Sequence, residues 1–331
     1  MNSSGYYASE ASGAMTFSIV IPAFNEETNI RKTLQALQDQ TLPKASFEII
    51  VVDNGSTDST VAAATSFVDK LPLQVVSKLG GRISAVRNYG ASLATGEILA
   101  FLDADCLSRP TWLEDSLKLA HQNMIWGAHY LVPRDATWVG KTWFDHQATE
   151  QQGPVSFIPG SNLFMHRSTF IKLGGFDELL ETSEDVELSQ RAISHGMQVI
   201  AYPSLAVYHE GTPRTLHQFY RQNRWHGKHV LRLFISNLPS TKHLHLVAMS
   251  FYTLVVFWAA IAVPLFALPR HRFAVAIAPF VLLILPAIVL GLKKAIAARR
   301  MSAAPKLCVL YMTYFLARAA ALTHMSLRSH R

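Results

Sequence analysis

The sequence predicts an α/β domain with a mostly parallel central sheet, followed by C-terminal transmembrane helices. Three observations support this fold class. Short apolar runs in the first half each end in polar residues and alternate with helical patterns, which is typical of a parallel sheet. Two long uncharged apolar runs follow, each long enough to cross a bilayer. All 23 acidic residues lie within residues 1–210, whereas residues 211–331 contain 16 of the 30 Lys and Arg residues.

Four strands are expected near the start of the chain, at residues 17–24, 47–52, 73–76 and 97–102. A helical pattern follows the first strand, from Asn25 toward Gln40, and a turn with a helix N-cap follows the second at residues 53–58. Ligands of such sheets bind beyond the carboxyl ends of the strands. We therefore expect Asp53, Asp103 and Asp105 to lie at one edge of the sheet.

Asp103 and Asp105 directly follow the apolar run at residues 97–102. A buried strand that ends in two carboxylates suggests a ligand, because unpaired buried charge is costly. Hard oxygen ligands suit Mn²⁺ or Mg²⁺, which proteins often hold through carboxylates and substrate phosphates. A solvated Asp-rich turn would explain this pair taken alone. Its convergence with Asp53 favours a metal site.

Eight short motifs follow one another between residues 17 and 226. They are Ile-Pro-Ala-Phe-Asn-Glu at 21–26, Val-Val-Asp-Asn-Gly-Ser-Thr-Asp at 51–58, Ala-Val-Arg-Asn at 85–88, Phe-Leu-Asp-Ala-Asp at 101–105, Gly-Ser-Asn at 160–162, Gly-Gly-Phe-Asp-Glu at 174–178, Glu-Asp at 184–185 and Arg-x-x-Arg-Trp at 221–225. In order and spacing they resemble the family 2 glycosyltransferases of GT-A fold. A nucleotidyltransferase is the alternative within this fold, but it would need a Gly-rich first loop, which residues 22–26 do not form.

The resemblance implies roles for the matching residues around a UDP- or GDP-linked sugar. The donor-binding residues would be Pro22, Ala23, Asn25, Glu26, Asp53, Arg87, Asp103 and Arg224. Asp53 would contact the nucleotide base and also cap its turn, while Arg87 and Arg224 would stabilise the leaving diphosphate. The ligands of Mn²⁺ or Mg²⁺ would be Asp105 with Asp103 nearby. His209 ends a strand-like run over residues 199–209 and is a further metal ligand, a contact to the diphosphate or a structural residue.

Glu184 and Asp185 are predicted to begin a helix, where acidic residues are expected for capping alone. The resemblance implies that Asp185 instead deprotonates the acceptor, with Glu184 supporting it. One base opposite the leaving group gives inversion at the anomeric carbon. The residues expected to bind the acceptor are Gly160, Ser161, Asn162, Arg221 and Trp225. Tight turns would explain the glycines at 160 and 174–175 equally well, and membrane anchoring would explain Trp225 almost as well.

The basic second half is predicted to be a membrane domain rather than a nucleic-acid-binding one, because its charges flank apolar runs. Residues 246–268 and 273–292 would form a hairpin of two crossings. We expect a third crossing at about 307–325, with an interfacial helix as the alternative because Arg318 lies inside it. Positive charge flanks the side shared with the motifs, which places that domain in the cytoplasm, at the bacterial inner membrane.

We therefore expect four segments along the chain. They are a disordered lead-in at 1–15, a GT-A catalytic domain at 16–212, a basic amphipathic interfacial segment at 213–244, and a membrane domain at 245–325. The interfacial segment would contact anionic membrane lipids. The two cysteines, Cys106 and Cys308, lack the spacing of a disulfide framework or a zinc site.

The expected function is the addition of one or a few sugars to a lipid-linked or glycan acceptor, in exopolysaccharide or glycolipid biosynthesis. Two or three helices cannot enclose a growing polymer, which argues against a processive synthase. Transfer to a polyprenyl phosphate is the alternative, and the motif at 221–225 disfavours it. An alternative of another class is a non-catalytic membrane adaptor that retains the fold. The presence of Asp53, Asp103, Asp105 and Asp185 disfavours it.

Overall fold

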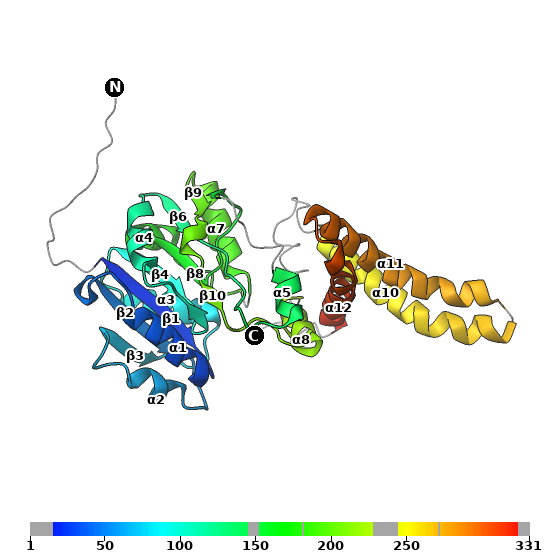
Figure 1. The fold of residues 1–331 in the computed structure, drawn as a ribbon, viewed down its shortest axis with the longest axis horizontal. Helices are drawn as coiled ribbons and strands as arrows, with labels where there is room; N and C mark the ends of the chain where they lie inside the picture. Colours follow the sequence, from blue (N-terminus) through cyan, green and yellow to red (C-terminus); the bar gives the residue numbers. More distant parts are fainter. Residues whose placement is uncertain (1–15, 145–151, 181, 228–243, 271, 324–331) are drawn as a thin grey trace, which may run out of the picture. The chain divides into compact units, whose positions relative to one another are not determined.

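The structure of the protein is a computed structural model that describes residues 16–144, 152–180, 182–227, 244–270 and 272–323 (Figure 1). Its contacts divide the chain into two compact units. The first unit consists of residues 1–131 and 148–211, and the second of residues 132–147 and 212–331. The expected lead-in at 1–15 and residues 228–243 of the expected interfacial segment lie outside the described residues.

The first unit is built on an eight-stranded sheet, counted over the described residues, with the order β3-β2-β1-β4-β8-β6-β9-β7 (Figure 1). The strands are β1 Phe17–Ala23, β2 Phe47–Asp53, β3 Leu73–Ser77, β4 Ile98–Leu102, β6 Met124–Gly127, β7 Gly153–Pro154, β8 Asn162–His166 and β9 Gln198–Ala201. β1 pairs in parallel with β2 and β4, and β2 pairs in parallel with β3. The predicted α/β class with a mostly parallel sheet is therefore confirmed.

β8 interrupts the parallel order because it runs antiparallel to both β4 and β6. Neither β6 nor β8 was predicted, since each is at most five residues long and Ile125 is the one β-branched residue in either. The predicted strand-like run at 199–209 is divided by a 3₁₀ turn at Pro203–Leu205. Its second part, β10 Tyr208–His209, pairs with β5 Cys106–Leu107 in a separate two-stranded ladder.

Helices cover both faces of the sheet because successive strand residues point to opposite sides. One core packs Ile19 and Ile21 of β1 against α1 Glu27–Gln38, α2 Thr60–Thr65 and α4 Trp112–Leu119. The other core packs Val20 against α3 Ile83–Leu93, α6 Arg167–Leu173 and α7 Glu184–Ser194. The sheet is thus the middle layer of three, between these two cores.

The second unit is helical. Its described helices are α5 Trp138–Phe144, α8 Leu216–Gly227, α10 Leu244–Ala267, α11 Phe273–Ala297 and α12 Ala304–Thr323. Residues 132–147, which the sequence analysis placed in the catalytic domain, belong here because α5 packs on this unit. The ring of Trp143 lies 4.8 Å from that of Phe219 in α8 and 5.3 Å from that of Tyr311 in α12.

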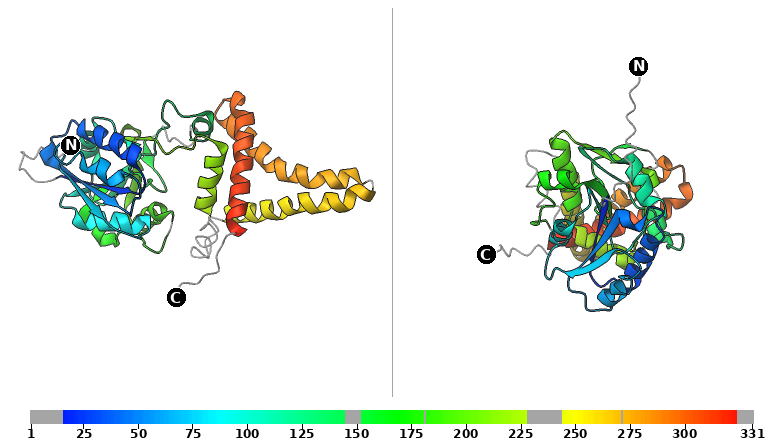
Figure 2. Two further views of the ribbon diagram at one scale, coloured as in Figure 1. Left: turned by 90° about the horizontal axis from the view of Figure 1, so that it is seen from below. Right: turned by 90° about the vertical axis from the view of Figure 1, so that its left-hand side faces the viewer.

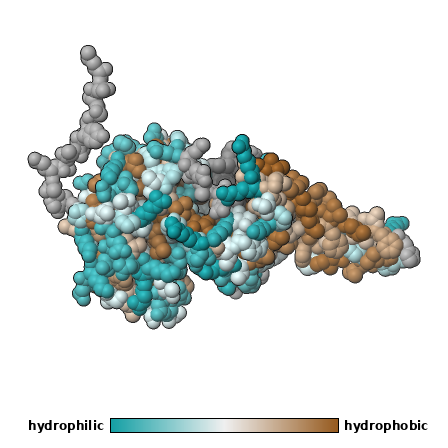
Figure 3. Space-filling model, viewed as in Figure 1, coloured by the Kyte–Doolittle hydropathy of each residue, from teal (hydrophilic) through white to brown (hydrophobic). Residues whose placement is uncertain are grey.

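Of the helices that the structure describes, α10 and α11 are long and apolar enough to cross a membrane. Figure 2 shows them as a hairpin, as predicted. Their large apolar side chains, such as Val255, Leu265 and Val281, are mostly exposed within the unit, and Figure 3 shows this hydrophobic surface in brown. Such a surface is unfavourable in water and suited to lipid.

α12 is not among the described helices apolar enough to span a membrane. Its Arg318 donates a hydrogen bond of 2.9 Å to the carbonyl of His226 at the end of α8, and its guanidinium lies 5.0 Å from the ring of Tyr314. A fixed charge inside the helix therefore argues against the expected third crossing. By length and composition, two of the described helices, α10 and α11, could cross a membrane.

Candidate active site

The carboxyl ends of the parallel strands meet at one edge of the sheet. Ala23 at the end of β1 is level with Asp53 at the end of β2, and Asp103 directly follows β4. Because β8 runs antiparallel to β4, its beginning lies at this edge. The backbone N–H of Asp103 accordingly donates to the carbonyl of Ser161 at 3.4 Å. The edge thus combines Asp53, Asp103 and the segment that begins at Gly160.

Asp105 and His209 come together just beyond this edge, because the β5–β10 ladder pairs His209 with Cys106. Nδ1 of His209 lies 3.6 Å from Oδ2 of Asp105, and the two side chains are 16% and 13% exposed. Ligand atoms of Asp105, Cys106 and His209 all lie within 4.8 Å of one another. Burial raises the pKa of Asp105, His209 opposes this shift, and Asp103 adds to it.

The surroundings of Asp105 and His209 fit a divalent metal ion. Nδ1 of His209 is buried and has no hydrogen-bond partner among the described residues. A Cβ at Gly211 would overlap Oδ2 of Asp105 and lie 2.8 Å from Cε1 of His209, so glycine keeps the space beside both groups open. A cation there would compensate the buried carboxylate. Cys106 is a poor ligand, because burial raises the pKa of its thiol and keeps it protonated.

Asp103 is not one of the three residues of that cluster and pairs instead with Arg87. Nη2 of Arg87 donates to Oδ1 of Asp103 at 2.6 Å, and Nη1 donates to Oε1 of Glu184 at 2.5 Å. Burial alone would lower the pKa of Arg87, but Asp103 and Glu184 outweigh it and hold that pKa above its ordinary value. Both ends of the guanidinium are occupied. The structure therefore pairs Arg87 with two carboxylates, and its expected role at the donor diphosphate stays a prediction.

Glu184 and Asp185 are the first two residues of α7, where the sequence placed a helix start. Glu184 is buried, and burial raises its pKa to about 7, with Arg87 opposing the shift and Asp185 adding to it. Asp185 is half-buried, and its Oδ2 accepts a hydrogen bond of 2.9 Å from the N–H of Gly160. Asp185 is therefore the more accessible carboxylate of the pair.

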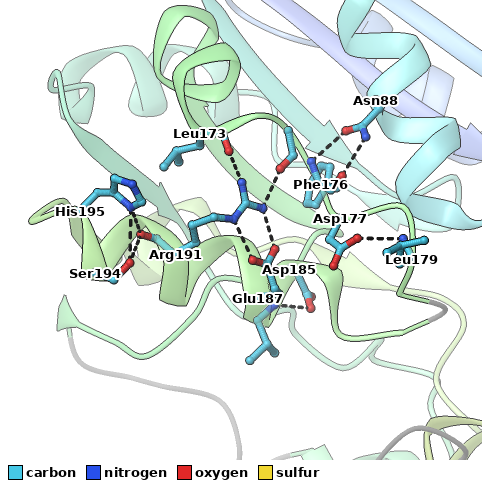
Figure 4. Close-up of polar contacts among 12 residues, drawn as sticks. Asn88, Leu173, Phe176, Asp177, Leu179, Asp185, Glu187, Arg191, Ser194 and His195 are labelled. Atoms are coloured by element: carbon cyan, nitrogen blue, oxygen red, sulfur yellow. Dashed lines mark hydrogen bonds and ion pairs between the residues drawn. The ribbon is translucent and has the colours of Figure 1, made fainter. Parts of the chain in front are cut away.

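The loop after α6 is braced from two sides (Figure 4). Arg191 of α7 binds Glu187 and donates to the carbonyls of Leu173 and Gly175. Asn88 of α3 contacts both the N–H and the carbonyl of Phe176 at 2.9 Å. Gly174 and Gly175 have φ values of 83° and 74°, so the backbone of the turn itself requires glycine there.

Two of the residues expected to bind the donor, Asn25 and Asp53, lie in interlocked turns. Asp53 caps its own turn by accepting from the N–H groups of Gly55 at 3.0 Å and Ser56 at 3.2 Å. Oδ1 of Asn25 accepts from the N–H of Thr57 at 2.8 Å. Burial raises the pKa of Glu26, with Asp105 and Asp103 adding to the shift. Pro22 and Ala23 are buried at the end of β1.

Asn162 does not have the accessible position expected of an acceptor-binding residue. Its side chain is fully buried, and its Nδ2 donates to the carbonyls of Ala128 at 3.2 Å and Leu205 at 2.8 Å. Its Oδ1 accepts from Nε1 of Trp112 at 3.1 Å. The assignment of Asn162 to the acceptor is therefore wrong for its side chain, which faces the protein interior. Its neighbour Ser161 is also buried.

Arg221, Arg224 and Trp225 lie on α8 in the second unit. Trp225 is 43% exposed. Together with Gln218, Arg221 and Gln222 it lines a hollow of about 370 Å³. Two amides, a guanidinium and an indole face are a set of groups that suits a sugar or a polar headgroup. The roles of these three residues at the reaction centre stay predictions.

Two neighbours of Asp105 and His209 were not predicted. The ring of Tyr130 lies 4.7 Å from that of His209, and burial raises the pKa of its phenol. Tyr130 follows β6, which runs in the same direction as β4. Predicting β6 from the sequence would therefore have placed Tyr130 at the carboxyl edge of the sheet. The importance of Gly211 had no signal in the sequence, because it depends on the folded positions of Asp105 and His209.

Comparison with known families decides the class of the protein. The glycosyl transferase family 2 model matches residues 18–174, and the glycosyl transferase family group 2 model matches residues 102–292, more than half of the chain. The chain belongs to glycosyltransferase family 2. This glycosyltransferase is 30% identical over 205 residues to the glycosyltransferase AglE of Haloferax volcanii, covering 59% of this chain and 67% of that protein.

Two further comparisons extend over more of this glycosyltransferase. It is 26% identical over 294 residues to a beta-monoglucosyldiacylglycerol synthase of Nostoc sp., covering 81% of this chain and 62% of that protein. Its fold is similar to that of the mannosyltransferase PcManGT of Pyrobaculum calidifontis, solved with GDP-Man and Mn²⁺. The TM-score is 0.58 at 23% identity, covering 92% of this chain and 86% of the other. The chain thus spans about two thirds or less of the length of these two curated relatives.

Proposed function

We propose that this glycosyltransferase is an inverting, metal-dependent enzyme that transfers a sugar from a UDP- or GDP-linked donor to a lipid-linked or glycan acceptor. The observation that carries the proposal is the arrangement at the sheet edge. Asp105 and His209 offer two adjacent metal ligands beside a space that Gly211 keeps open. Asp185 is the accessible carboxylate at the start of α7.

Asp105 and His209 would hold Mn²⁺ or Mg²⁺, with Asp103 on the donor side of the same edge. When bound, the cation would supply Lewis-acid stabilisation of the charge that develops on the leaving diphosphate. The interlocked turns that contain Asn25 and Asp53 would position the nucleoside. That PcManGT was solved with GDP-Man and Mn²⁺ supports this choice of donor class and metal.

Asp185 would accept the proton of the attacking acceptor hydroxyl. Its Oδ2 is oriented by the N–H of Gly160, whereas Glu184 is committed to Arg87. A single base on the acceptor side implies direct displacement, in which the acceptor oxygen bonds to the anomeric carbon as the diphosphate leaves. The expected product therefore has inverted configuration. A positioned base contributes typically about 10²–10⁴-fold to such a rate.

The second unit supports a membrane-bound acceptor and a non-processive reaction. α10 and α11 would anchor the enzyme, and the basic residues around them would bind anionic lipids and keep the catalytic unit at the cytoplasmic face. Arg221 and Trp225 would bind the acceptor, and Arg224 the donor, from α8. The name of the Nostoc relative, a diacylglycerol glycosylating enzyme, supports a glycolipid product. The two apolar helices that the structure describes would be too few to enclose a growing polymer.

Transfer of label into lipid tests the proposal. Membranes that contain the enzyme are incubated with Mn²⁺ and a panel of labelled nucleotide sugars, and the lipids are then extracted. We expect one sugar to enter the lipid fraction with the wild type and none with Asp105→Asn. Label that mild acid releases as a sugar from a phosphodiester would favour the polyprenyl-phosphate alternative. A wild type that neither binds nor transfers any nucleotide sugar would contradict the proposal.

A further inference from the structure

Arg87 is a buried cation held between carboxylates from two distant parts of the chain. It lies on α3, whereas Asp103 follows β4 and Glu184 begins α7. The distances are 2.6 Å from Nη2 to Asp103 and 2.5 Å from Nη1 to Glu184, and the Arg87 side chain is 4% exposed. A guanidinium can form two such bonds at once because its nitrogens lie in a rigid, planar fork.

The packing around the guanidinium is as specific as its hydrogen bonds. A Cβ at Gly160 would lie 2.9 Å from Nη1 and 3.0 Å from Cζ of Arg87. Gly160 is not among the described glycines with positive φ, so the need for glycine comes from the space that Arg87 occupies. The ring of Phe176 lies 5.7 Å from Cζ of Arg87. The guanidinium therefore packs against the backbone of Gly160 and lies beside the ring of Phe176.

Gly160 also connects this ion pair to the proposed base. Its N–H donates to Oδ2 of Asp185 at 2.9 Å, and Asp185 directly follows Glu184. Arg87 thus reaches Asp185 along two routes, through Glu184 and through Gly160. At its other end it holds Asp103 beside the metal-binding edge. One cation therefore links the donor side and the acceptor side of the site.

We infer that Arg87 is a positioning residue, which sets the distance between the metal-binding edge and Asp185 by bridging Asp103 and Glu184. The inference rests on the proposed function, because it assigns to Arg87 a role in the same transfer reaction. It differs from a donor-binding role, in which a guanidinium would contact the diphosphate. A positioning residue affects the turnover step, whereas a diphosphate ligand affects donor affinity as well.

Arg87→Lys separates these roles, because lysine retains the charge but its single ammonium cannot form a fork between two carboxylates. We expect kcat to fall ten- to hundred-fold, since a displacement of about 1 Å in a reacting group can cost about 100-fold. The donor Kd, measured by calorimetry with Mn²⁺, should stay within threefold of the wild type. Arg191→Lys is the matched control, because Arg191 also binds a carboxylate and carbonyl groups but contacts neither Asp103 nor Glu184. Its kcat should stay within threefold.

A kcat of Arg87→Lys within threefold of the wild type would overturn the inference, and so would a tenfold rise in donor Kd, whether or not kcat also falls. If Arg87→Lys does not fold, Asp103→Asn, Glu184→Gln and the double variant decide. Both changes act through one guanidinium, so their effects should not be independent. The fold decrease in kcat of the double variant should be at least five times smaller than the product of the two single fold decreases. Multiplicative losses would refute the bridge. A wild type without transfer would instead refute the proposed function.

Discussion

Replacing Asp185 by asparagine removes the proposed base and changes little else in the structure. Asparagine is nearly isosteric, and its amide oxygen can still accept from the N–H of Gly160, which lies 2.9 Å from Oδ2 of Asp185. The Arg87–Glu184 ion pair does not include the substituted atoms. The fold, the metal-binding pair and the donor site should therefore persist, so that the chemical step is isolated.

The magnitude follows from the loss of proton transfer. A positioned general base contributes about 10²–10⁴-fold, which corresponds to about 3–5 kcal/mol of activation free energy. We therefore expect kcat for Asp185→Asn to fall by two to four orders of magnitude. The donor Kd should stay within about threefold, because Asp185 lies on the acceptor side and binds no donor group in the proposal.

The assay measures kcat from transfer of labelled sugar and donor Kd from calorimetry in the presence of Mn²⁺. Asp177→Asn is a matched control, because both aspartates accept a hydrogen bond from a backbone N–H close by in the chain. Oδ1 of Asp177 accepts from the N–H of Leu179 (Figure 4). Oδ1 of Asp185 accepts from the N–H of Val186. Its kcat should stay within twofold of the wild type. If Glu184→Gln lowers kcat more than Asp185→Asn does, the assignment within this pair is wrong. If both variants transfer sugar normally, the base lies elsewhere.

Three further predictions concern the metal, pH and topology. Gly211→Ala should raise the Mn²⁺ concentration for half-maximal activity at least tenfold, because the new Cβ would overlap Oδ2 of Asp105; an unchanged metal titration would refute the fit. Burial raises the pKa of Glu184 to about 7, so the folded state binds this proton more tightly than the unfolded state does. The unfolding free energy of the wild type relative to Glu184→Gln should therefore fall between pH 5 and 7, and a rise would contradict the raised pKa. Protease added to sealed right-side-out cells should leave residues 1–240 uncut, whereas cleavage there would reverse the orientation.

The parallel half of the sheet and the apolar helical hairpin could be predicted because each has a strong local pattern. β1, β2 and β4 are mostly apolar runs that end in polar turns, and α10 and α11 each contain a long uncharged apolar stretch. The antiparallel β8 could not be predicted, because its five residues resemble a loop as much as a strand. Its direction depends on pairing with β4, from which it is about 60 residues distant in the chain.

The identities of the charged residues at the site could be predicted, but their partners could not. Arg87 was expected at the donor, but its bond to Glu184, which lies 97 residues away in the chain, could not be predicted. Asn162 was expected at the acceptor, yet its amide joins three elements inside the protein. Motifs identify which residues occur in a site, whereas long-range packing decides which of their atoms remain accessible to a ligand.

The central claim is that Asp105 and His209 hold a divalent cation on which sugar transfer depends. Its most direct test is transfer of labelled sugar into lipid as Mn²⁺ is titrated into metal-free wild type and into Asp105→Asn. We predict saturable activation of the wild type, complete inhibition by a chelator, and no activation of Asp105→Asn, while both proteins unfold at nearly the same temperature. Full activity of the wild type in excess chelator, or normal Mn²⁺ activation of Asp105→Asn, would contradict this account.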